Sequence, residues 1–270
     1  MKTNVTQRWN AGRASYRPAG EPINTRLYEV APLHEDRIAR DYVIEHHYSG
    51  SYPAARRRFA LHRGDRLVGV AVFSVPSNDA ALACLPGSGG TRIELGRFVL
   101  DDDVPANGES WFLARAFDLL RAEGFTGILS FSDPIPRRAG DGSIIFPGHV
   151  GTIYQALGAT YLGRATARTL RVLPSGAILN DRAIQKIRSG ERGWRYAAEL
   201  LTQHGATPLA DDADRIAWLR TWIPAITHPL RHTGNHRYAW ALQKADRRHF
   251  PASMPYPKII VAQGELALAA

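Results

Sequence analysis

The sequence predicts a mixed α/β fold in which a central sheet is flanked by helices. Residues 93–131 have the pattern of a strand, a helix and a second buried strand, the order of a βα crossover. Residues 59–75 have the pattern of two antiparallel strands with a turn at residues 63–66. Residues 235–242 alternate polar and apolar side chains, as a final strand would. A basic helical insertion at residues 176–232 is expected before that last strand.

Helices are expected where apolar residues recur at helical spacing, over residues 32–47, 111–123, 151–157, 180–203 and 211–222. In the first of these, Ile38, Tyr42 and Val43 are spaced for one buried face. Ser110 is the expected N-cap of the second, because its hydroxyl can accept a hydrogen bond from a first-turn amide. Residues 161–173 are expected to form one strand or a pair.

The ends of the chain differ from its middle. Residues 1–25 are polar and rich in Gly, Pro and Arg, which predicts a flexible N-terminal arm. Residues 26–250 are expected to form a single domain that contains the insertion at residues 176–232. Residues 251–270 are expected to be a C-terminal tail. Residues 134–148 hold three prolines and three glycines, which predicts a long loop.

Composition excludes several classes of protein. Apolar residues make up 44% of the 270 residues and charged residues 22%, which is typical of a folded chain rather than a disordered one. No stretch approaches the roughly 20 apolar residues that cross a bilayer, so no membrane partner is expected. The single cysteine, Cys84, excludes an intramolecular disulfide and predicts a reducing, cytoplasmic location. Cys84 can be a nucleophile, but an inert thiol is the simpler interpretation.

The charge balance favours a polyanionic partner. The chain has 34 basic and 25 acidic residues, a net charge of +9, and residues 181–258 alone carry 13 against 7. Such a field attracts nucleic acid. The candidate contacts to double-stranded DNA are Arg56, Arg57, Lys186, Arg188 and Arg192. A solvated basic face, or a genome that prefers arginine, remains the alternative.

The crossover at residues 93–131 and the next helix together resemble the core of the GNAT acyltransferase superfamily. That resemblance implies acetyl-CoA, whose pyrophosphate lies on backbone amides at a helix N-terminus. This chain departs from that pattern, because its loop contains Asp101, Asp102 and Asp103. Three carboxylates would repel a pyrophosphate by about 1 kcal/mol or more each. Acetyl-CoA is therefore disfavoured, and the donor of any transferred group is unknown.

Five short motifs in order resemble the phage Mu Mom family over roughly residues 40–258. They are His47-Tyr48-Ser49, Glu94-Leu95-Gly96-Arg97, Asn107-Gly108-Glu109-Ser110, Ser130-Phe131-Ser132-Asp133 and Gly148-His149-Val150-Gly151-Thr152-Ile153-Tyr154. The resemblance implies a GNAT-like catalytic domain that converts adenine in duplex DNA to an N6-carbamoylmethyl derivative. It implies protection of phage DNA from host restriction, and a phage or prophage gene expressed in a bacterial cytoplasm.

The same resemblance implies that the catalytic residues are Tyr48, Arg97, Ser110, Asp133 and Tyr154. At the end of a strand, Asp133 could take a proton from the adenine amine, and Arg97 could clamp a carboxylate or phosphate. From a helix N-terminus, Ser110 could orient the donor. The phenols of Tyr48 and Tyr154 could act as acids or as stacking surfaces for an extruded base.

Each assignment has a structural alternative. An ion pair between strands would account for Arg97 and Asp133, and capping alone would account for Ser110. Tyr154 would serve equally as a core aromatic. His47 is a further candidate substrate contact beside Tyr48.

Iron is associated with the Mom family, and His47 and His149 are the candidate ligands here. Their spacing is not diagnostic of a metal site. A hydrogen-bonding role for each histidine is the alternative.

Three functions remain open at this stage. The first is an adenine-modifying enzyme of Mom type. The second is a GNAT acetyltransferase that uses acetyl-CoA on a protein, an RNA or a small molecule. The third is a non-catalytic nucleic-acid-binding protein on a GNAT scaffold. The residues do not set the oligomeric state, and a homodimer is kept open.

Overall fold

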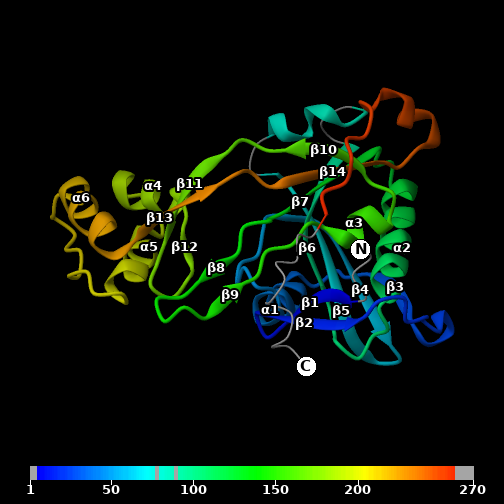
Figure 1. Cartoon of the computed structure of the whole chain (residues 1–270), viewed down its shortest axis with the longest axis horizontal. Helices are drawn as coiled ribbons and strands as arrows, with labels where there is room; N and C mark the ends of the chain where they lie inside the picture. The colour runs from blue at the N-terminus through cyan, green and yellow to red at the C-terminus, as the bar shows by residue number, and fades with distance from the viewer. Residues whose placement is uncertain (1–4, 77–78, 88–90, 259–270) are drawn as a thin grey trace. The chain divides into compact units, whose positions relative to one another are not determined.

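The computed structural model describes residues 5–76, 79–87 and 91–258 (Figure 1). The chain divides into two compact units. Unit 1 comprises the residues up to Pro134, His149–Ala165 and the residues from Asn235 onward, and unit 2 comprises Ile135–Gly148 and Thr166–Gly234. Unit 2 therefore contains the expected insertion at residues 176–232, the residues directly before and after it, and the separate segment at residues 135–148. This differs from the single domain expected over residues 26–250.

A seven-stranded mixed sheet is the centre of unit 1, in the order β10-β14-β7-β6-β5-β4-β3. Its strands are β3 Glu29–Pro32, β4 Ala55–Arg63, β5 Arg66–Ser74, β6 Arg92–Leu100, β7 Gly127–Ser132, β10 Thr160–Arg164 and β14 His236–Ala241. The β6–β7 pair is parallel and every other neighbouring pair is antiparallel. The predicted central mixed sheet, with its hairpin, crossover and final strand, is confirmed.

The parallel strands β6 and β7 stop pairing partway along their length. Their register runs from Arg92 with Gly127 to Leu95 with Ser130, although β6 continues to Leu100 and β7 to Ser132. Between the two strands the chain forms helix α2, Gly108–Ala122. The end of their pairing opens the space in which the candidate site lies.

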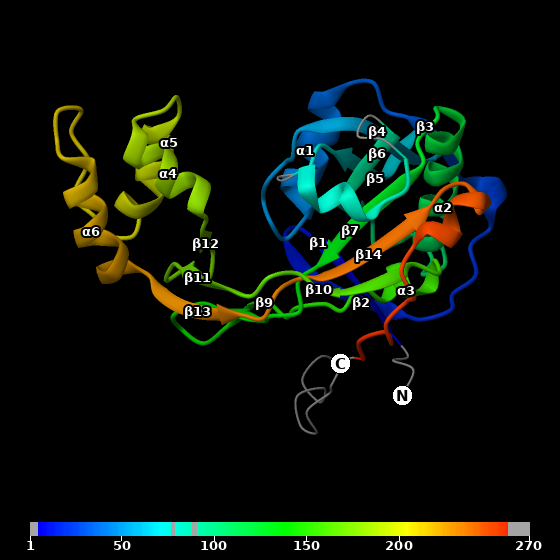
Figure 2. The same ribbon diagram turned by 90° about the horizontal axis from the view of Figure 1, so that it is seen from above.

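Helices cover both faces of this sheet (Figure 2). Helix α2 packs Phe112, Leu113 and Leu120 into a core with residues of β4 to β7, and α3, Thr152–Ala156, adds Tyr154 to the same core. Helix α1, Asp36–His46, covers the other face with Ala39 and Val43. Strand β5 is apolar from Leu67 to Phe73 because its alternate residues enter these two different cores.

Two local predictions about these helices are wrong. Ile38 was expected on the buried face of α1 but is 40% exposed, because the helix buries the stripe that holds Ala39 and Val43 instead. Ser110 was expected to cap α2, but the helix begins three residues earlier than expected, with Asn107 at the N-cap position. The Ser110 hydroxyl lies inside the first turn and donates to the Asn107 carbonyl at 3.2 Å.

The N-terminal segment differs from the flexible arm expected over residues 1–25. Its described part forms a hairpin of β1, Val5–Asn10, and β2, Arg13–Pro18, followed by a 3-10 turn, η1, at Thr25–Leu27. Arg8 is 3% exposed and Trp9 is 9% exposed. Burial of these two large side chains explains why the segment is ordered against unit 1. Residues 1–4 lie outside the described residues.

The chain ends in part as a tail without regular structure. After β14 come a 3-10 turn, η4, at Lys244–His249, and residues 251–258. Met254 donates its backbone N–H to the Tyr161 carbonyl at 3.0 Å, and the Tyr256 hydroxyl donates to the Ala159 carbonyl at 2.6 Å. Residues 259–270 of the expected tail lie outside the described residues. A further 3-10 turn, η2, spans Asp79–Cys84 and leaves Cys84 half-buried.

Unit 2 combines a small sheet with three helices (Figure 2). Its elements are β8 Arg137–Arg138, β9 Ile144–Phe146, β11 Arg168–Val172, β12 Ile178–Leu179, α4 Asp181–Ser189, α5 Trp194–Thr202, α6 Arg215–Ile226 and β13 His228–His232. The helices share a core of Ile187, Leu201, Trp218 and their neighbours. The single helix expected over residues 180–203 is two, because Gly190 ends α4 with a left-handed φ of 67°.

Two other features of unit 2 bear on the sequence predictions. Asn180 caps α4 by accepting the Ala183 N–H at 2.7 Å, as a cap at this position was expected to do. The loop expected at residues 134–148 contains the short β8–β9 pair. In the described ranges of the whole chain, no helix is both long and apolar enough to cross a membrane.

Candidate functional site

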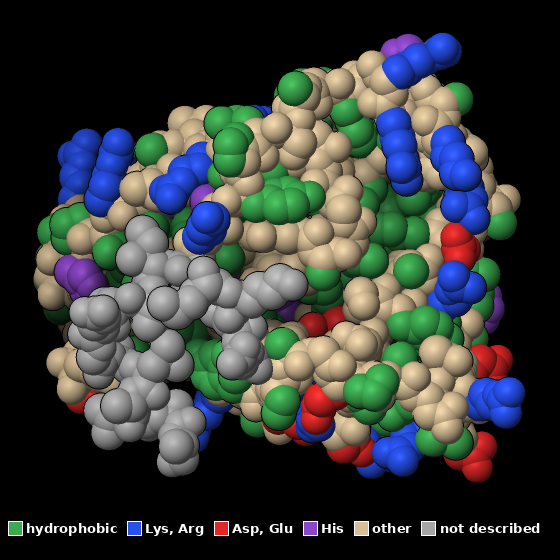
Figure 3. Space-filling model, turned by 45° about the vertical axis from the view of Figure 1, so that its right-hand side comes forward, with side chains coloured by type: hydrophobic (Ala, Val, Ile, Leu, Met, Phe, Trp, Pro, Cys, Tyr) green, Lys and Arg blue, Asp and Glu red, His purple; other side chains and the backbone are tan. Residues whose placement is uncertain are grey.

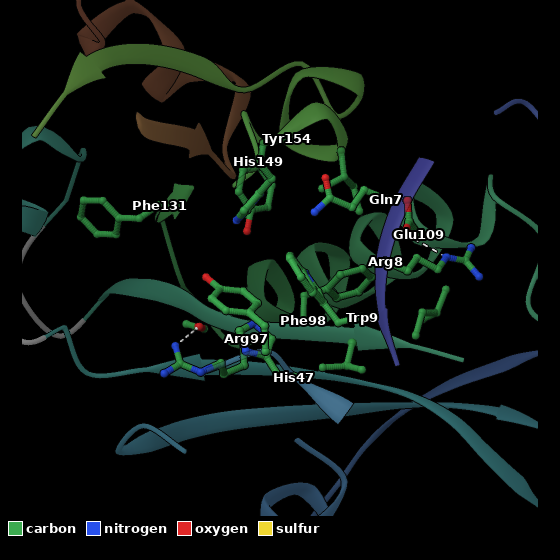
Figure 4. A pocket seen from close by; sticks show the side chains of 15 residues that line it. Gln7, Arg8, Trp9, His47, Arg97, Phe98, Glu109, Phe131, His149 and Tyr154 are labelled. Atoms are coloured by element: carbon green, nitrogen blue, oxygen red, sulfur yellow. Dashed lines mark hydrogen bonds and ion pairs between the residues drawn. The ribbon is translucent and has the colours of Figure 1, made fainter. Parts of the chain in front are cut away.

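A cavity of about 80 Å³ lies in unit 1 where β6 and β7 have stopped pairing (Figure 4). Side chains from five places in the sequence form its wall: strand β1, the segment after α1, strand β6, the first turn of α2, and the segment from β7 to α3. His47, Tyr48, Arg97, His149 and Tyr154, five residues singled out by the sequence, all line it.

Arg97 holds the β6 wall to the segment that follows α1. Its Nε and Nη2 donate to the carbonyl and hydroxyl of Ser51 at 3.0 and 2.9 Å, and its Nη1 donates to the Gly96 carbonyl at 2.6 Å. Burial lowers the pKa of the Arg97 guanidinium from its usual value, yet it stays a cation. Gly96 is required beside it, since a Cβ there would lie 2.5 Å from Ser74 Oγ and 3.3 Å from Pro53.

Tyr154 enters the cavity from the short helix α3. Its ring lies 5.4 Å from that of Tyr238 and 5.6 Å from that of Trp240, so it is also a core aromatic. Gly151 permits this packing: its φ is +69°, and a Cβ would lie 2.7 Å from the Tyr154 ring. Burial raises the pKa of the Tyr154 hydroxyl, which therefore remains protonated at neutral pH.

His47 and Tyr48 form the wall directly after α1. Nδ1 of His47 accepts the Ser49 N–H at 3.1 Å, so the proton of the neutral imidazole is on Nε2. Burial, with the nearby charges of Arg97 and His149, lowers the pKa of His47 well below its usual value. The Tyr48 ring lies 4.2 Å from the His47 ring and 6.2 Å from the His149 ring.

The wall from strand β1 was missed by the sequence analysis. The Trp9 ring lies 4.4 Å from that of Tyr48, and its neighbour Arg8 lies on the other side of the strand. Arg8 donates to the carbonyls of Asp101, Val104 and Pro105 at 2.8, 2.5 and 3.0 Å, and its Nε lies 3.1 Å from Glu109 Oε1. The sequence offered one signal for this wall. Arg8 and Trp9 are adjacent in a segment whose polar and apolar residues partly alternate, as they do in a strand, although the segment is otherwise polar enough to predict a flexible arm.

Two carboxyl groups near the cavity, those of Glu94 and Glu109, have pKa values near neutral pH that the sequence did not predict. Burial raises the pKa of Glu109 to about 7 despite the adjacent Arg8, and burial raises that of Glu94 to about 7 despite the charge of Arg97. Glu109 lines the cavity, and Glu94 interacts electrostatically with both Arg97 and Tyr154. A group with such a pKa can accept or release a proton near neutral pH.

Two predicted catalytic residues do not line the cavity. Ser110 lies in the first turn of α2, and Asp133 follows β7. The Asp133 carbonyl accepts the His149 N–H at 2.8 Å, which ties Asp133 to a cavity residue through the backbone. The expected pairing of Arg97 with Asp133 gives way to the bonds that Arg97 makes with Ser51 and Gly96.

The predicted DNA contacts lie in both units. In unit 1, Arg56 donates to the Arg92 carbonyl at 2.9 Å, and Arg57 forms an ion pair with Glu123. In unit 2, Lys186 and Arg188 lie in the last turns of α4, and Arg192 is exposed in the link to α5. Acidic side chains visible in Figure 3 lie mostly in its lower half, and basic ones dominate the upper part of the same face.

The loop before α2 does not fit the pyrophosphate of coenzyme A. Its carbonyls surround the Arg8 guanidinium, while the N–H groups of Ala106 and Asn107 already donate to the side-chain and backbone oxygens of Glu21. The buried Glu109 carboxyl lies in the first turn. An arriving anion would lack donors and would meet two carboxyl groups.

The aspartate run itself contributes less repulsion than the sequence analysis expected. Asp101 accepts hydrogen bonds from Tyr42 and Arg66, and Asp103 also pairs with Arg66. Asp102 accepts from Asn10 at 3.1 Å and from Ser15 at 2.7 Å, both on the hairpin. These partners compensate the three carboxylates, so the poor fit to coenzyme A comes from Arg8, Glu21 and Glu109.

The residues around the cavity are equally poor as a metal centre. Within the described ranges there is no group of three or more His, Cys, Asp or Glu side chains that could hold a metal ion. His47 and His149 both line the cavity, but Nδ1 of His47 is engaged by Ser49. Two imidazoles without a third such ligand do not fit the iron that the sequence analysis kept open.

Comparison with known proteins identifies a family. The model of the Mom protein family matches residues 28–258. No curated protein matches the chain.

Similar solved structures include several acetyltransferases. They include the ribosomal-protein-S18-alanine N-acetyltransferase of Escherichia coli, with 16% identity, 56% of this chain and 88% of that one covered, and a TM-score of 0.33. An N-acetyltransferase of Staphylococcus aureus Mu50 has 10% identity, 80% and 99% coverage, and a TM-score of 0.34. A tandem GNAT protein of the clavulanic acid pathway has 12% identity, 73% and 65% coverage, and a TM-score of 0.37. Similarity at this level carries no information about substrate or cofactor.

Proposed function

Because the chain belongs to the Mom protein family, we propose that it is an enzyme that modifies adenine in duplex DNA. Family membership supports DNA modification in general, and the proposal adds a carbamoylmethyl group on N6 as the product. The observation that carries it furthest is the cavity of unit 1, where Tyr48, Arg97 and Tyr154 meet from three separate segments. Protection of phage DNA from restriction, in a bacterial cytoplasm, is the biological role that such a product would serve.

The chemistry requires a proton acceptor and a fixed positive charge. N6 of adenine bonds to the methylene carbon of the incoming group while the bond between that carbon and the donor breaks. The leaving group of the donor takes the electron pair of the broken bond, and one N6 hydrogen leaves as a proton. Glu109 lines the cavity but is already bonded to Arg8, so the proposed acceptor is Glu94, which interacts electrostatically with the cavity residues Arg97 and Tyr154 and has a pKa of about 7. Arg97 supplies positive charge for a donor or leaving group that carries negative charge, and the protonated hydroxyl of Tyr154 can donate a hydrogen bond to it.

Binding of DNA is assigned chiefly to unit 2. This unit carries 12 Lys and Arg against 7 Asp and Glu, a net charge of +5 in less than a third of the chain. Lys186, Arg188 and Arg192 are candidates for phosphate contacts. Replacing all three with Gln should weaken DNA binding and reduce its dependence on salt by nearly three counterions.

The proposal is tested by nucleoside mass spectrometry of plasmid DNA from cells that express the chain. A deoxyadenosine heavier by one carbamoylmethyl group supports it, and that species should disappear in Arg97→Ala. DNA binding without any modified nucleoside would favour a non-catalytic binder. Saturable acetyl-CoA binding by calorimetry, with acetylated product, would favour an acetyltransferase instead.

A further inference from the structure

The hairpin β1–β2 presents a tryptophan to the cavity from an anchored strand. Arg8 makes three hydrogen bonds with the loop before α2 and an ion pair with Glu109. Neighbouring residues of a strand point to opposite sides, so this anchor turns Trp9 toward Tyr48 and His149 (Figure 4). The position of the indole is therefore set by buried polar contacts rather than by a loose arm.

Trp9, Tyr48 and His149 form an aromatic cluster at the cavity. The Trp9 ring lies 4.4 Å from Tyr48 and 6.1 Å from His149, and the Tyr48 ring lies 6.2 Å from His149. The last two contacts are edge-on, with interplanar angles of 74° and 69°. Rings that meet at such angles form the sides of a concave surface, whereas rings stacked in parallel would cover one another.

The charges around the aromatic cluster select among planar ligands. A cation would suit aromatic faces, but the guanidinium of Arg97 lines the same cavity. An anion would suit Arg97, but the carboxyl groups of Glu94 and Glu109 lie close by. The ligand that best suits the cavity is an uncharged planar ring with hydrogen-bonding groups on its edge. Gln7, on the same side of β1 as Trp9, also lines the cavity, and an amide offers the donor and acceptor pair that matches adenine.

We propose that the aromatic cluster, with Trp9 as its principal surface, binds the adenine ring after that base has left the DNA helix. The inference rests on the proposed function and adds the subsite that receives the base. An enzyme that acts on N6 within a duplex must extrude the nucleotide, and stacking on aromatic side chains repays the lost base stacking. Trp9 is thus a substrate-contacting residue contributed by the N-terminal hairpin.

The test is a binding measurement that needs no group donor. Fluorescence anisotropy compares a labelled duplex that contains a paired adenine with the same duplex in which that adenine faces an abasic site. Wild-type protein should bind the second duplex about 10- to 100-fold more tightly, because the unpaired base is cheaper to extrude. An unpaired thymine at that position should bind less tightly than adenine.

The variants separate stacking from folding. Trp9→Ala should lose the preference for unpaired adenine while keeping its affinity for the paired duplex within about twofold, since phosphate contacts dominate that affinity. Trp9→Phe should retain most of the preference. Tyr16→Ala is the matched control, since this half-exposed ring is on the same hairpin but does not line the cavity.

Three results would overturn the base subsite. They are a full preference in Trp9→Ala, an equal loss of affinity for both duplexes in Trp9→Ala and Trp9→Phe, and no preference in the wild type. If any of these occurs while cells still produce the modified nucleoside, the proposed function stands and the subsite fails. If the wild type prefers unpaired adenine but yields no modified nucleoside, the proposed function fails and the subsite stands.

Discussion

The two sides of the cavity differ in what holds them in place. On one side, Arg97 and Tyr154 are positioned by the central sheet and by α3. Gly96 lets the backbone of β6 lie close to Ser74, and Gly151 lets the backbone before α3 lie close to the ring of Tyr154. On the other side, the hairpin is held by the buried Arg8 and by the bonds of Asn10 and Ser15 to Asp102, which are nearer the surface. The sheet side should therefore tolerate substitutions in its reactive groups without unfolding. The hairpin side should lose stability when its anchor is changed.

Glu94→Gln should have the largest effect on the reaction rate, with a smaller effect on the pH dependence of stability. Loss of a proton acceptor costs about 10²- to 10⁴-fold in rate. Wild-type activity should rise as the pH increases through about 7, because Glu94 accepts a proton only when ionised, and the variant should lose this rise. Plasmid modification in a cell extract that supplies the donor measures both quantities. Glu123→Gln, at the far end of α2, is the control; an unchanged pH profile in Glu94→Gln would remove Glu94 from the mechanism.

Arg8→Met should have the next largest effect, on the hairpin side and on stability. The change leaves the buried Glu109 and three carbonyls without their partner, a loss of about 3–5 kcal/mol in the free energy of unfolding. Urea denaturation followed by circular dichroism measures it. Arg13→Met, at an exposed position of the same hairpin, should stay within about 0.5 kcal/mol. Equal stability of Arg8→Met and wild type would contradict the anchoring role.

Arg97→Lys should reduce activity by about 10²-fold with little loss of stability. Lysine keeps the charge but cannot reproduce the fork that bonds both the carbonyl and the hydroxyl of Ser51. The yield of modified deoxyadenosine at matched expression measures the effect. Arg121→Lys, which changes an exposed arginine of α2 outside the cavity, should keep its yield within a few fold. Full activity of Arg97→Lys would assign the residue to packing.

Glu109→Gln should produce the smallest change, visible as a pH dependence of stability. Burial raises the pKa of Glu109 from its ordinary value to about 7, so between those two pH values the folded state holds a proton that the unfolded state has lost. Wild-type stability should therefore fall as the pH rises from about 5 to about 7, by about 1–3 kcal/mol. The variant should lose the part of this decrease that Glu109 contributes and keep the part that comes from Glu94. Urea titrations at pH 5 and pH 8 measure it, and parallel curves for the two proteins would contradict the raised pKa.

Much of the fold could be predicted because its signals are local. The strands of the hairpin β4–β5 and the crossover from β6 to β7 can be recognised from apolar residues that recur at the spacing of strands and of a helix. The start of α2 could not be predicted from the same rules. The Ser110 hydroxyl could cap a helix, but the N-cap position of α2 is Asn107. The backbone N–H groups of Ala106 and Asn107, just before the helix, donate to oxygens of Glu21.

The candidate site was predicted on one side and missed on the other for a related reason. Tyr48, Arg97 and Tyr154 belong to motifs with local structural requirements, such as the left-handed glycine before Tyr154. Arg8 and Trp9 belong to a polar segment whose order depends on contacts about 100 residues away in sequence. Such contacts leave no periodic pattern. The same contacts explain why the aspartate run, which appears repulsive in sequence, is compensated in the folded chain.

The most direct test of the central claim is the mass of the deoxyadenosine species in plasmid DNA from cells that express the wild-type chain, with Arg97→Lys expressed in parallel. We expect a species heavier than deoxyadenosine by one carbamoylmethyl group in the wild type, and a yield reduced by about 10²-fold in the variant. Unmodified deoxyadenosine alone, from cells with ample folded wild-type protein, would contradict it.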